Sequence, residues 1–304
     1  MKLQRVLVIY KKSVYQLYVK ERGEKKYIRA LEAQPTALAR AMEAHYDNER
    51  TLERVQAALT KRGIDFRCAY RARKQAIEGV DLVITVGGDG TLLDTSHAVD
   101  DIPVLGVNSS PKYSVGHFCT AIADTIDPVL DEISAGRLPL IAVQRLRVST
   151  GDITPAVLAL NEVLFAHPSP AGTSRYELFV NGDHEEQKSS GVWIATAAGS
   201  TAAIRSAGGA VVPLDSLITQ YWVREPYFGF NSPLRLLGGT FEGPIEIVSR
   251  LRTSMAYIDG HRMQLPLGYG ETLRITLADR PLYLFRHTEG EPHAQSRELR
   301  GVRL

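Results

Sequence analysis

Apolar residues in the first 140 positions occur in two patterns, which alternate along the chain. Continuous apolar runs over Arg5–Tyr10, Asp81–Val86 and Ile102–Asn108 predict buried strands, because parallel strands are covered on both faces. The stretches Thr36–Gly63 and Asp124–Gly136 have helical spacing, and each ends on a glycine, as helices often do. Strands that alternate with helices predict a doubly wound, Rossmann-like α/β domain.

The pattern changes near Leu138. Beyond it, short segments such as "RYELFVNGDH", "PIEIVSRL", "ETLRITLAD" and "PLYLFR" alternate apolar with polar residues and are separated by turn residues. They predict an all-β region, interrupted by one helix near Ser200–Ser206. We therefore expect three parts: an α/β domain over residues 1–140, a β-rich, β-sandwich-like domain over 141–285, and a polar tail over 286–304.

Composition narrows the classes of function. A net charge of +2 over 304 residues, without a basic stripe, argues against nucleic acid as a partner. No apolar run reaches 18 residues, and "MKLQRVLVIYKK" lacks the features of a signal peptide, so we expect no membrane span. Cys68 and Cys119 are isolated, which favours a reducing compartment and predicts neither a disulfide framework nor a metal site. These features predict a cytoplasmic protein.

The stretch "VGGDGTLL" carries the first candidate site. Three glycines, Gly87, Gly88 and Gly90, surround Asp89 where a buried strand ends, and a helix is expected from about Thr91. Ligands bind at this edge of parallel sheets, and glycines let backbone N–H groups approach a phosphate closely. The glycines and Thr91 are therefore candidate phosphate-binding residues.

A carboxylate repels a neighbouring phosphate, so the position of Asp89 needs a functional explanation. Asp89 could take a proton from an attacking hydroxyl, or interact with the Mg²⁺ that accompanies a nucleoside triphosphate. Alternatively, it could cap the following helix in an ordinary tight turn. The chain has no G-x-x-x-x-G-K-[ST] sequence and no G-x-G-x-x-G at this strand exit, which excludes a P-loop enzyme and an ordinary Rossmann dehydrogenase.

Two further groups of polar residues interrupt the β-rich region. Asn161 and Glu162 lie within an apolar run, where polar groups cost free energy unless they are partnered. A carboxylate can accept hydrogen bonds from both hydroxyls of a ribose, and an amide can pair with an adenine edge, but only near a strand end can both contact one ligand. A strand terminus in solvent is the alternative.

Gly199, Ser200 and Thr201 precede a helix and suit phosphates or an adenine edge, or form an ordinary Ser/Thr cap.

Four motifs occur in order: "VGGDGTLL", "LNEV", "TAAGSTAAIRSAGGAVV" and "AYIDGHRM". Together they resemble the motifs of the NAD kinase family, whereas the first alone is also similar to diacylglycerol and sphingoid-base kinases. The long segment "NSSPKYSVGHFCT" and the absence of an acid before "TAAGST" resemble the plant and organellar NAD(H) kinase branch.

This resemblance implies that the chain transfers a phosphoryl group from ATP, accompanied by Mg²⁺, to the 2′-hydroxyl of the adenosine ribose of NAD⁺ or NADH. It implies a catalytic Asp89 and a homodimer or homotetramer. It also implies that Asn161, Glu162 and Ala202 hold the dinucleotide, and that Gly199, Ser200 and Thr201 complete the pocket. The alternatives are a lipid kinase and a non-catalytic NAD(H)-binding sensor. The preferred redox form, and polyphosphate as the donor, remain open.

Overall fold

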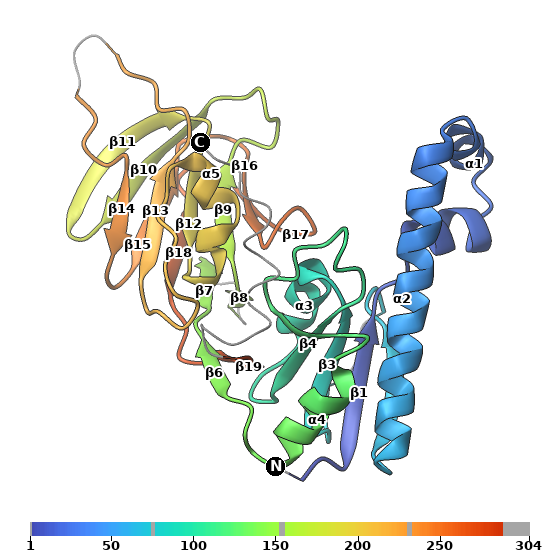
Figure 1. The fold of residues 1–304 in the computed structure, drawn as a ribbon. Coiled ribbons are helices and arrows are strands. Elements are labelled where there is room, and N and C mark those ends of the chain that lie inside the picture. The colour runs from blue at the N-terminus through green and yellow to red at the C-terminus, as the bar shows by residue number, and fades with distance from the viewer. Residues whose placement is uncertain (1, 74–76, 152–155, 230–232, 288–304) are drawn as a thin grey trace. The chain divides into compact units, whose positions relative to one another are not determined.

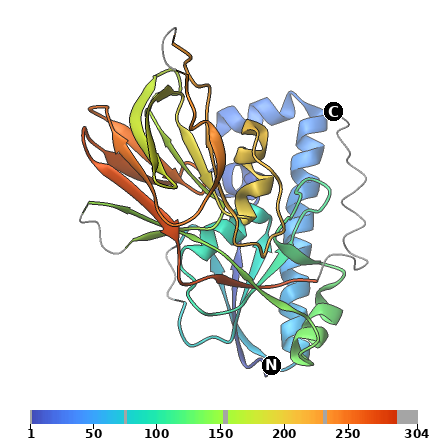
Figure 2. The same cartoon turned by 90° about the vertical axis from the view of Figure 1, so that its left-hand side faces the viewer.

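The computed structural model describes residues 2–73, 77–151, 156–229 and 233–287 (Figures 1 and 2). The chain divides into two compact units, one made of residues 1–141 and 283–304 and the other of residues 142–282. Most of the polar tail expected over residues 286–304 lies outside the described residues. No helix in the described part of the chain is long and apolar enough to cross a membrane.

The first unit contains a seven-stranded sheet in the order β2-β1-β3-β4-β19-β6, with β5 also paired to β4. The pairings β1–β2, β1–β3, β3–β4, β4–β5 and β4–β19 are parallel. The strands are β1 (Arg5–Tyr10), β2 (Asp65–Tyr70), β3 (Leu82–Gly87), β4 (Val104–Asn108), β5 (Cys119–Ile122), β6 (Leu140–Val143) and β19 (Leu282–Phe285).

Helices cover both faces of this sheet. Side chains of α2 and α4 pack with one set of strand residues in a single buried cluster, and α3 contacts β1, β3 and β4 outside that cluster. The helices are a π-helix η1 (Tyr15–Glu21), α1 (Lys25–Glu32), α2 (Pro35–Lys61), α3 (Asp89–Ser96) and α4 (Ile126–Ser134). The doubly wound prediction is therefore confirmed.

Two helical segments were missing from the sequence prediction. Neither η1 nor α1 contains a buried residue, and with 7 and 8 residues both are too short for a periodic apolar pattern to identify them as helices. The helix expected over Thr36–Gly63 is α2, which Pro35 starts at the first helical position and Gly63 follows with φ of 65°.

The second unit is a sandwich of two six-stranded antiparallel sheets whose apolar side chains form one core. The first sheet contains β11 (Asp183–Ser189), β10 (Ser174–Val180), β15 (Ile245–Ser249), β18 (Thr272–Leu277), β7 (Leu146–Thr150) and β8 (Val157–Ala159). The second contains β14 (Gly238–Phe241), β13 (Thr219–Val223), β12 (Val192–Ala195), β9 (Glu162–Ala166), β16 (Ser254–Ile258) and β17 (Met263–Leu267). The helix expected near Ser200–Ser206 forms as a 3₁₀ turn η2 (Ala198–Thr201) followed by α5 (Ala203–Ala207).

Strand β19 does not belong to the sheet that its position in the sequence predicts. The segment "PLYLFR" forms β19, but β19 joins the sheet of the first unit, where Leu284 pairs with Val104 of β4. The Thr120 hydroxyl also donates a hydrogen bond to the Phe285 carbonyl oxygen at 2.7 Å. Local alternation predicts a strand but not its partner, so the sequence wrongly assigns this segment to the β-rich domain.

Candidate functional site

In the first unit, the candidate residues lie at the carboxyl edge of the parallel sheet. Gly87 ends β3, Gly88 is the N-cap of α3, and Asp89 is its first residue. Asp89 Oδ1 accepts a hydrogen bond from the Phe118 N–H at 2.8 Å. Within the described residues the structure records no hydrogen bond to Asp89 Oδ2, so one oxygen is held and the other remains available to a ligand.

The helix-capping alternative for Asp89 is wrong. The helix begins at Asp89 itself, and its N-cap makes no side-chain hydrogen bond. The Thr91 N–H donates to the Gly88 carbonyl oxygen at 2.9 Å rather than to a side chain. The carboxylate is therefore fixed by the loop before β5, not by the helix that it starts.

The three glycines around Asp89 do not serve one purpose. None has a positive φ, so backbone freedom is not what requires them. A Cβ at Gly87 would lie 2.7 Å from the Thr91 Cβ, and one at Gly88 would overlap the Ser114 hydroxyl. At Gly90 the nearest atom is Arg71 Nη1 at 3.8 Å, so Gly90 is exposed and has room for a ligand.

Buried hydroxyls without partners gather at the same edge. Asn108, the last residue of β4, shapes the following loop by accepting from the Ser110 N–H at 3.1 Å and donating to the Ser114 carbonyl oxygen at 3.0 Å. The hydroxyl oxygens of Thr91, Ser109 and Ser110 are buried and have no hydrogen-bond partner within the described residues. Because such groups are costly when unpaired, they indicate a place where a ligand can supply partners.

In the second unit, Asn161 directly precedes β9 and Glu162 is its first residue, the strand-end position that contact with one ligand requires. Their backbone is held by Asp259, whose carboxylate accepts from the N–H groups of residues 160, 161 and 162 at 2.7, 2.7 and 3.1 Å. Asp259 lies in the turn between β16 and β17 with φ of 48°. Asp259 is thus a positioning residue for the Asn161–Glu162 pair.

The side chains of this pair are buried and incompletely partnered. Asn161 is 7% and Glu162 is 8% exposed, and neither Asn161 Oδ1 nor Glu162 Oε2 has a hydrogen-bond partner among the residues that the structure describes. Burial, together with the nearby Asp259 carboxylate, raises the pKa of Glu162 to about 8. The two acceptor atoms can be satisfied by hydroxyl or amine donors of a ligand.

The "TAAGST" motif packs directly against this pair. The Thr196 hydroxyl donates to the Leu160 carbonyl oxygen at 2.5 Å, and the Thr196 N–H donates to the Asn161 carbonyl oxygen at 2.9 Å. A Cβ at Gly199 would lie 2.7 Å from the Asn161 carbonyl carbon, so only glycine fits there. The structure therefore brings two of the sequence motifs into one site.

The remaining predicted residues of this motif differ in environment. The Ser200 hydroxyl is buried and bonded to the backbone of Val212, accepting from its N–H at 3.2 Å and donating to its oxygen at 3.3 Å. Thr201 and Ala202 are half-buried. Ser200 thus ties η2 to the segment after α5, which is a structural contact.

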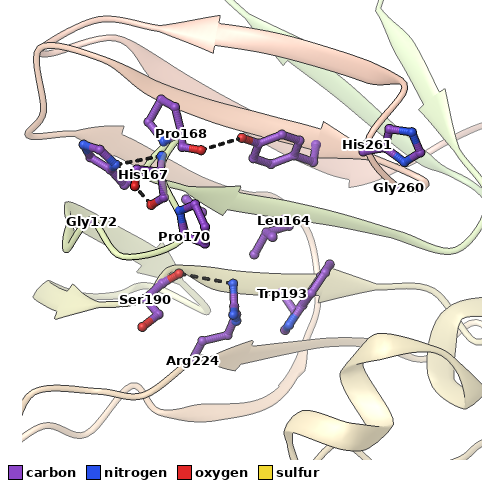
Figure 3. A pocket seen from close by; sticks show the side chains of 13 residues that line it. Leu164, His167, Pro168, Pro170, Gly172, Ser190, Trp193, Arg224, Gly260 and His261 are labelled. Atoms are coloured by element: carbon purple, nitrogen blue, oxygen red, sulfur yellow. Dashed lines mark hydrogen bonds between the residues drawn. The ribbon is translucent and has the colours of Figure 1, made fainter. Parts of the chain in front are cut away.

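A cavity of about 330 Å³ is lined by Leu164 of β9, two positions after Glu162 (Figure 3). Val163 and Phe165 point into the sandwich core, so Glu162 and Leu164 share the opposite face of β9. Trp193 of β12 and Tyr257 of β16 are the cross-strand partners of Leu164, and all three line the cavity. Its apolar and aromatic walls suit a flat ring.

A divalent cation has few protein ligands here. No group of three or more His, Cys, Asp or Glu side chains suited to a metal ion occurs among the described residues. Mg²⁺ commonly keeps several waters and is held by substrate phosphates with one or two carboxylates. Asp89, with one oxygen available, fits such a role.

Sequence reasoning missed Asp259 and Thr196. Asp259 lies in an Asp-Gly pair between two alternating segments, a strong hairpin-turn signal, but the turn does not reveal where the carboxylate points.

Comparison with known proteins gives three kinds of match. Residues 1–138 match a family model described as the ATP-NAD kinase N-terminal domain. A probable NADH kinase of Oryza sativa subsp. japonica is 34% identical over 260 residues, covering 77% of this chain and 80% of the relative. An NADH kinase of Arabidopsis thaliana is 35% identical over 262 residues, covering 75% and 79%.

Solved structures share the fold at low identity. An NAD kinase from Archaeoglobus fulgidus, in complex with ATP, has a TM-score of 0.70 at 21% identity, covering 97% of this chain and 98% of its own. A yeast NADH kinase complexed with NADH has a TM-score of 0.71 at 17% identity, covering 100% and 91%. Both matches extend over the parallel sheet and the sandwich together.

Proposed function

The chain belongs to the NAD kinase family, and on this basis we propose that it is an ATP-dependent NAD(H) kinase. It transfers the γ-phosphoryl group of ATP to the 2′-hydroxyl of the adenosine ribose, which gives NADP(H) and ADP. A bond forms between the 2′-oxygen and the γ-phosphorus, and the bond from that phosphorus to the β–γ bridging oxygen breaks.

The observation that supports Asp89 as the catalytic residue is its half-held carboxylate. The Phe118 N–H fixes Oδ1, which leaves Oδ2 to accept the proton of the 2′-hydroxyl as the new bond forms. Alternatively, the same oxygen orients the Mg²⁺ that accompanies ATP and offsets phosphate charge when bound. Gly87, Gly88, Gly90 and Thr91 are proposed to carry the phosphates, and Gly90 has the open space that this requires.

The second unit is proposed to hold the adenosine half of the dinucleotide. Glu162 accepts hydrogen bonds from ribose hydroxyls, and Asn161 pairs with the adenine edge, which satisfies the two buried acceptor atoms. Gly199, Ser200, Thr201 and Ala202 shape the adjoining wall. Of these, Ser200 contributes by holding η2 in place, because its hydroxyl is already bonded to Val212.

Three finer properties are proposals of the same kind. Mg²⁺ enters with ATP, because Mg²⁺ is commonly held by substrate phosphates together with one or two carboxylates. The chain works in the cytoplasm, since neither of its two cysteines forms a disulfide, and it forms a homodimer or homotetramer. Light scattering of the purified protein measures the oligomeric state directly.

The deciding experiment is an assay of NADP(H) formation with Mg²⁺–ATP, in which NAD⁺ and NADH are supplied in parallel. Phosphorylation of either substrate is the expected result, and the ratio of the two kcat/KM values gives the preferred redox form. A parallel reaction with inorganic polyphosphate tests the alternative donor. If no donor phosphorylates either dinucleotide while NADH binds tightly, the chain is a sensor; activity on diacylglycerol or sphingosine instead would make it a lipid kinase.

A further inference from the structure

Three neighbouring strands of the first unit end at one level. Tyr10 of β1 is opposite Tyr70 of β2 and Val86 of β3 in the register of the sheet. The residues that follow are Lys11, Arg71 and Gly87, so two cations lie at the edge that carries the glycine-rich loop (β1 and β3 in Figure 1). Backbone hydrogen bonds fix this arrangement, since the Lys11 N–H donates to the Val86 oxygen at 3.1 Å and the Arg71 N–H to the Tyr10 oxygen at 3.0 Å.

The Arg71 side chain reaches the open part of the loop. Its Nη1 lies 3.8 Å from the position that a Cβ would take at Gly90. The same nitrogen lies 3.2 Å from Asp94 Oδ2 of α3, which holds the guanidinium in place. A ligand that approaches Gly90 therefore meets a positioned cation.

Lys11 has an unusual environment for a lysine. It is half-buried, and among the described residues its ammonium group has no recorded hydrogen-bond or ion-pair partner. Burial lowers its pKa, and the nearby Arg71 guanidinium lowers it further, partly offset by Cys119. Lys12, the next residue, forms an ion pair with Glu21 at 2.7 Å.

A half-buried cation beside a second cation costs free energy unless an anion is supplied. Asp89 supplies negative charge at the loop but is bonded to Phe118, and Asp94 is engaged with Arg71. A polyphosphate chain can supply this anion, because its negative charge stabilises the Lys11 and Arg71 cations. The two cations in turn offset the repulsion between the polyphosphate and Asp89.

We propose that Lys11 and Arg71 form a cationic site for the polyphosphate chain of the phosphoryl donor as it passes Gly90. The identity of the donor rests on the proposed function, whereas the chemistry of the site does not. ATP and inorganic polyphosphate present the same group, and the experiment separates them.

The test measures binding of Mg²⁺–ATP and of inorganic tripolyphosphate by titration calorimetry. We expect Lys11→Gln and Arg71→Gln each to weaken binding of at least one ligand about 10- to 100-fold, the loss typical of a hydrogen bond to a charged group. Lys11→Arg should restore most of the affinity, and Lys12→Gln, the matched control, should bind as the wild type does. The proposal is overturned if Lys11→Gln binds both ligands normally, or if Lys12→Gln loses as much affinity.

Two further measurements distinguish a role of Lys11 in ligand binding from a role in the stability of the fold. NADH affinity, followed by fluorescence, and thermal unfolding should be unchanged in Lys11→Gln, because the change removes a charge without a partner. Should Lys11→Gln fail to fold, Lys11→Met keeps the length of the side chain and serves the same comparison. In turnover, KM for the donor should rise more than kcat falls.

Failure of the proposed function has a different signature. A wild-type protein that phosphorylates neither dinucleotide overturns the kinase assignment, yet tripolyphosphate binding and its dependence on Lys11 still decide the cationic site. Binding of tripolyphosphate without binding of ATP would point to inorganic polyphosphate as the ligand. If the substitutions weaken binding of neither ligand, the cationic site is overturned and the kinase assignment is unaffected.

Discussion

The two units each present a carboxylate to a ligand, but they prepare it in different ways. Asp89 is half-buried, and a backbone N–H holds one of its oxygens. Glu162 is buried, its carboxylate has an unpartnered oxygen, and the backbone at residues 160–162 is held by Asp259. The first arrangement leaves an oriented, accessible oxygen, whereas the second leaves an acceptor whose charge is costly until a ligand arrives.

The difference agrees with the two proposed tasks. A group that exchanges a proton must be accessible and oriented toward the substrate hydroxyl, and it gains little from burial. A group that selects a ligand gains specificity from burial, because an unsatisfied acceptor discriminates strongly against ligands that lack the matching donor. The five predictions below test this contrast.

The largest effect is expected at Asp89. Asp89→Asn keeps an oxygen to accept the Phe118 N–H but cannot take a proton, so kcat should fall about 10²- to 10⁴-fold. NADH affinity and the unfolding temperature should not change. A variant with nearly wild-type kcat would remove the general-base role and leave only the orientation of Mg²⁺–ATP.

Asp259 should come next, through binding rather than turnover. Asp259→Asn removes the charge that accepts three backbone N–H groups, each such bond to a charged group being worth about 1.5–3 kcal/mol. We expect dinucleotide affinity to fall about 10- to 100-fold and the second unit to unfold at a lower temperature. Calorimetric titration with NADH checks the first effect. Unchanged affinity with lowered stability would show that Asp259 supports only the fold.

Glu162 should give a pH-dependent effect of about tenfold. The ionised carboxylate accepts ribose hydroxyls, so wild-type affinity for NADH should rise as the pH rises through the pKa of about 8. Glu162→Gln should bind about tenfold more weakly at pH 9 and show no such rise. A wild-type affinity that is flat from pH 7 to 9 would contradict this assignment.

The stability of the ligand-free protein should show the opposite trend. The folded pKa of Glu162, about 8, lies above its ordinary value of 4.5, so the folded state binds more protons than the unfolded state between these values. The contribution of Glu162 to stability is fully present below about pH 4.5 and is lost as the pH rises through 8. Above that pH, Glu162→Gln should be more stable than the wild type by about 1–3 kcal/mol, measured by denaturant unfolding.

The smallest effects separate the glycines. Gly87→Ala places a methyl group 2.7 Å from the Thr91 Cβ and should cost about 1–3 kcal/mol of unfolding free energy. Gly90→Ala meets no atom closer than 3.8 Å and should leave stability unchanged or slightly higher. If phosphates pass Gly90, this variant should nevertheless lose activity severalfold. Full activity in Gly90→Ala would indicate that the chain of the donor lies elsewhere.

Local patterns predicted much of this molecule because its strands and helices follow clear periodicities. The run "RVLVIY" became β1 with the bounds expected, and the alternating segments after Leu138 became the sandwich. The glycine-rich stretch placed Asp89 at the end of a strand, whereas for Asn161 and Glu162 a strand end was only the condition for contact with one ligand. Each of these inferences needs only neighbours in sequence.

The remainder depends on contacts between distant residues. Nothing near Asp259 in sequence indicates that its carboxylate holds residues 160–162, about a hundred positions earlier. Lys11 and Arg71 are ordinary basic residues until the register of β1 with β2 and β3 brings them to one edge. The glycines were interpreted as sites where backbone N–H groups approach a phosphate, yet Gly87 and Gly88 provide room for Thr91 and Ser114.

The return of β19 to the first sheet has a consequence for the order of synthesis on the ribosome. The Thr120 hydroxyl donates a hydrogen bond to the Phe285 carbonyl oxygen. Arg286 donates to the carbonyl oxygens of Pro139 and His117. The amino-terminal sheet therefore cannot be completed until the whole sandwich has been translated. A fragment that stops at residue 141 would lack β19, which lies between β4 and β6, and the edges left unpaired at Val104 and along β6 would favour aggregation over independent folding.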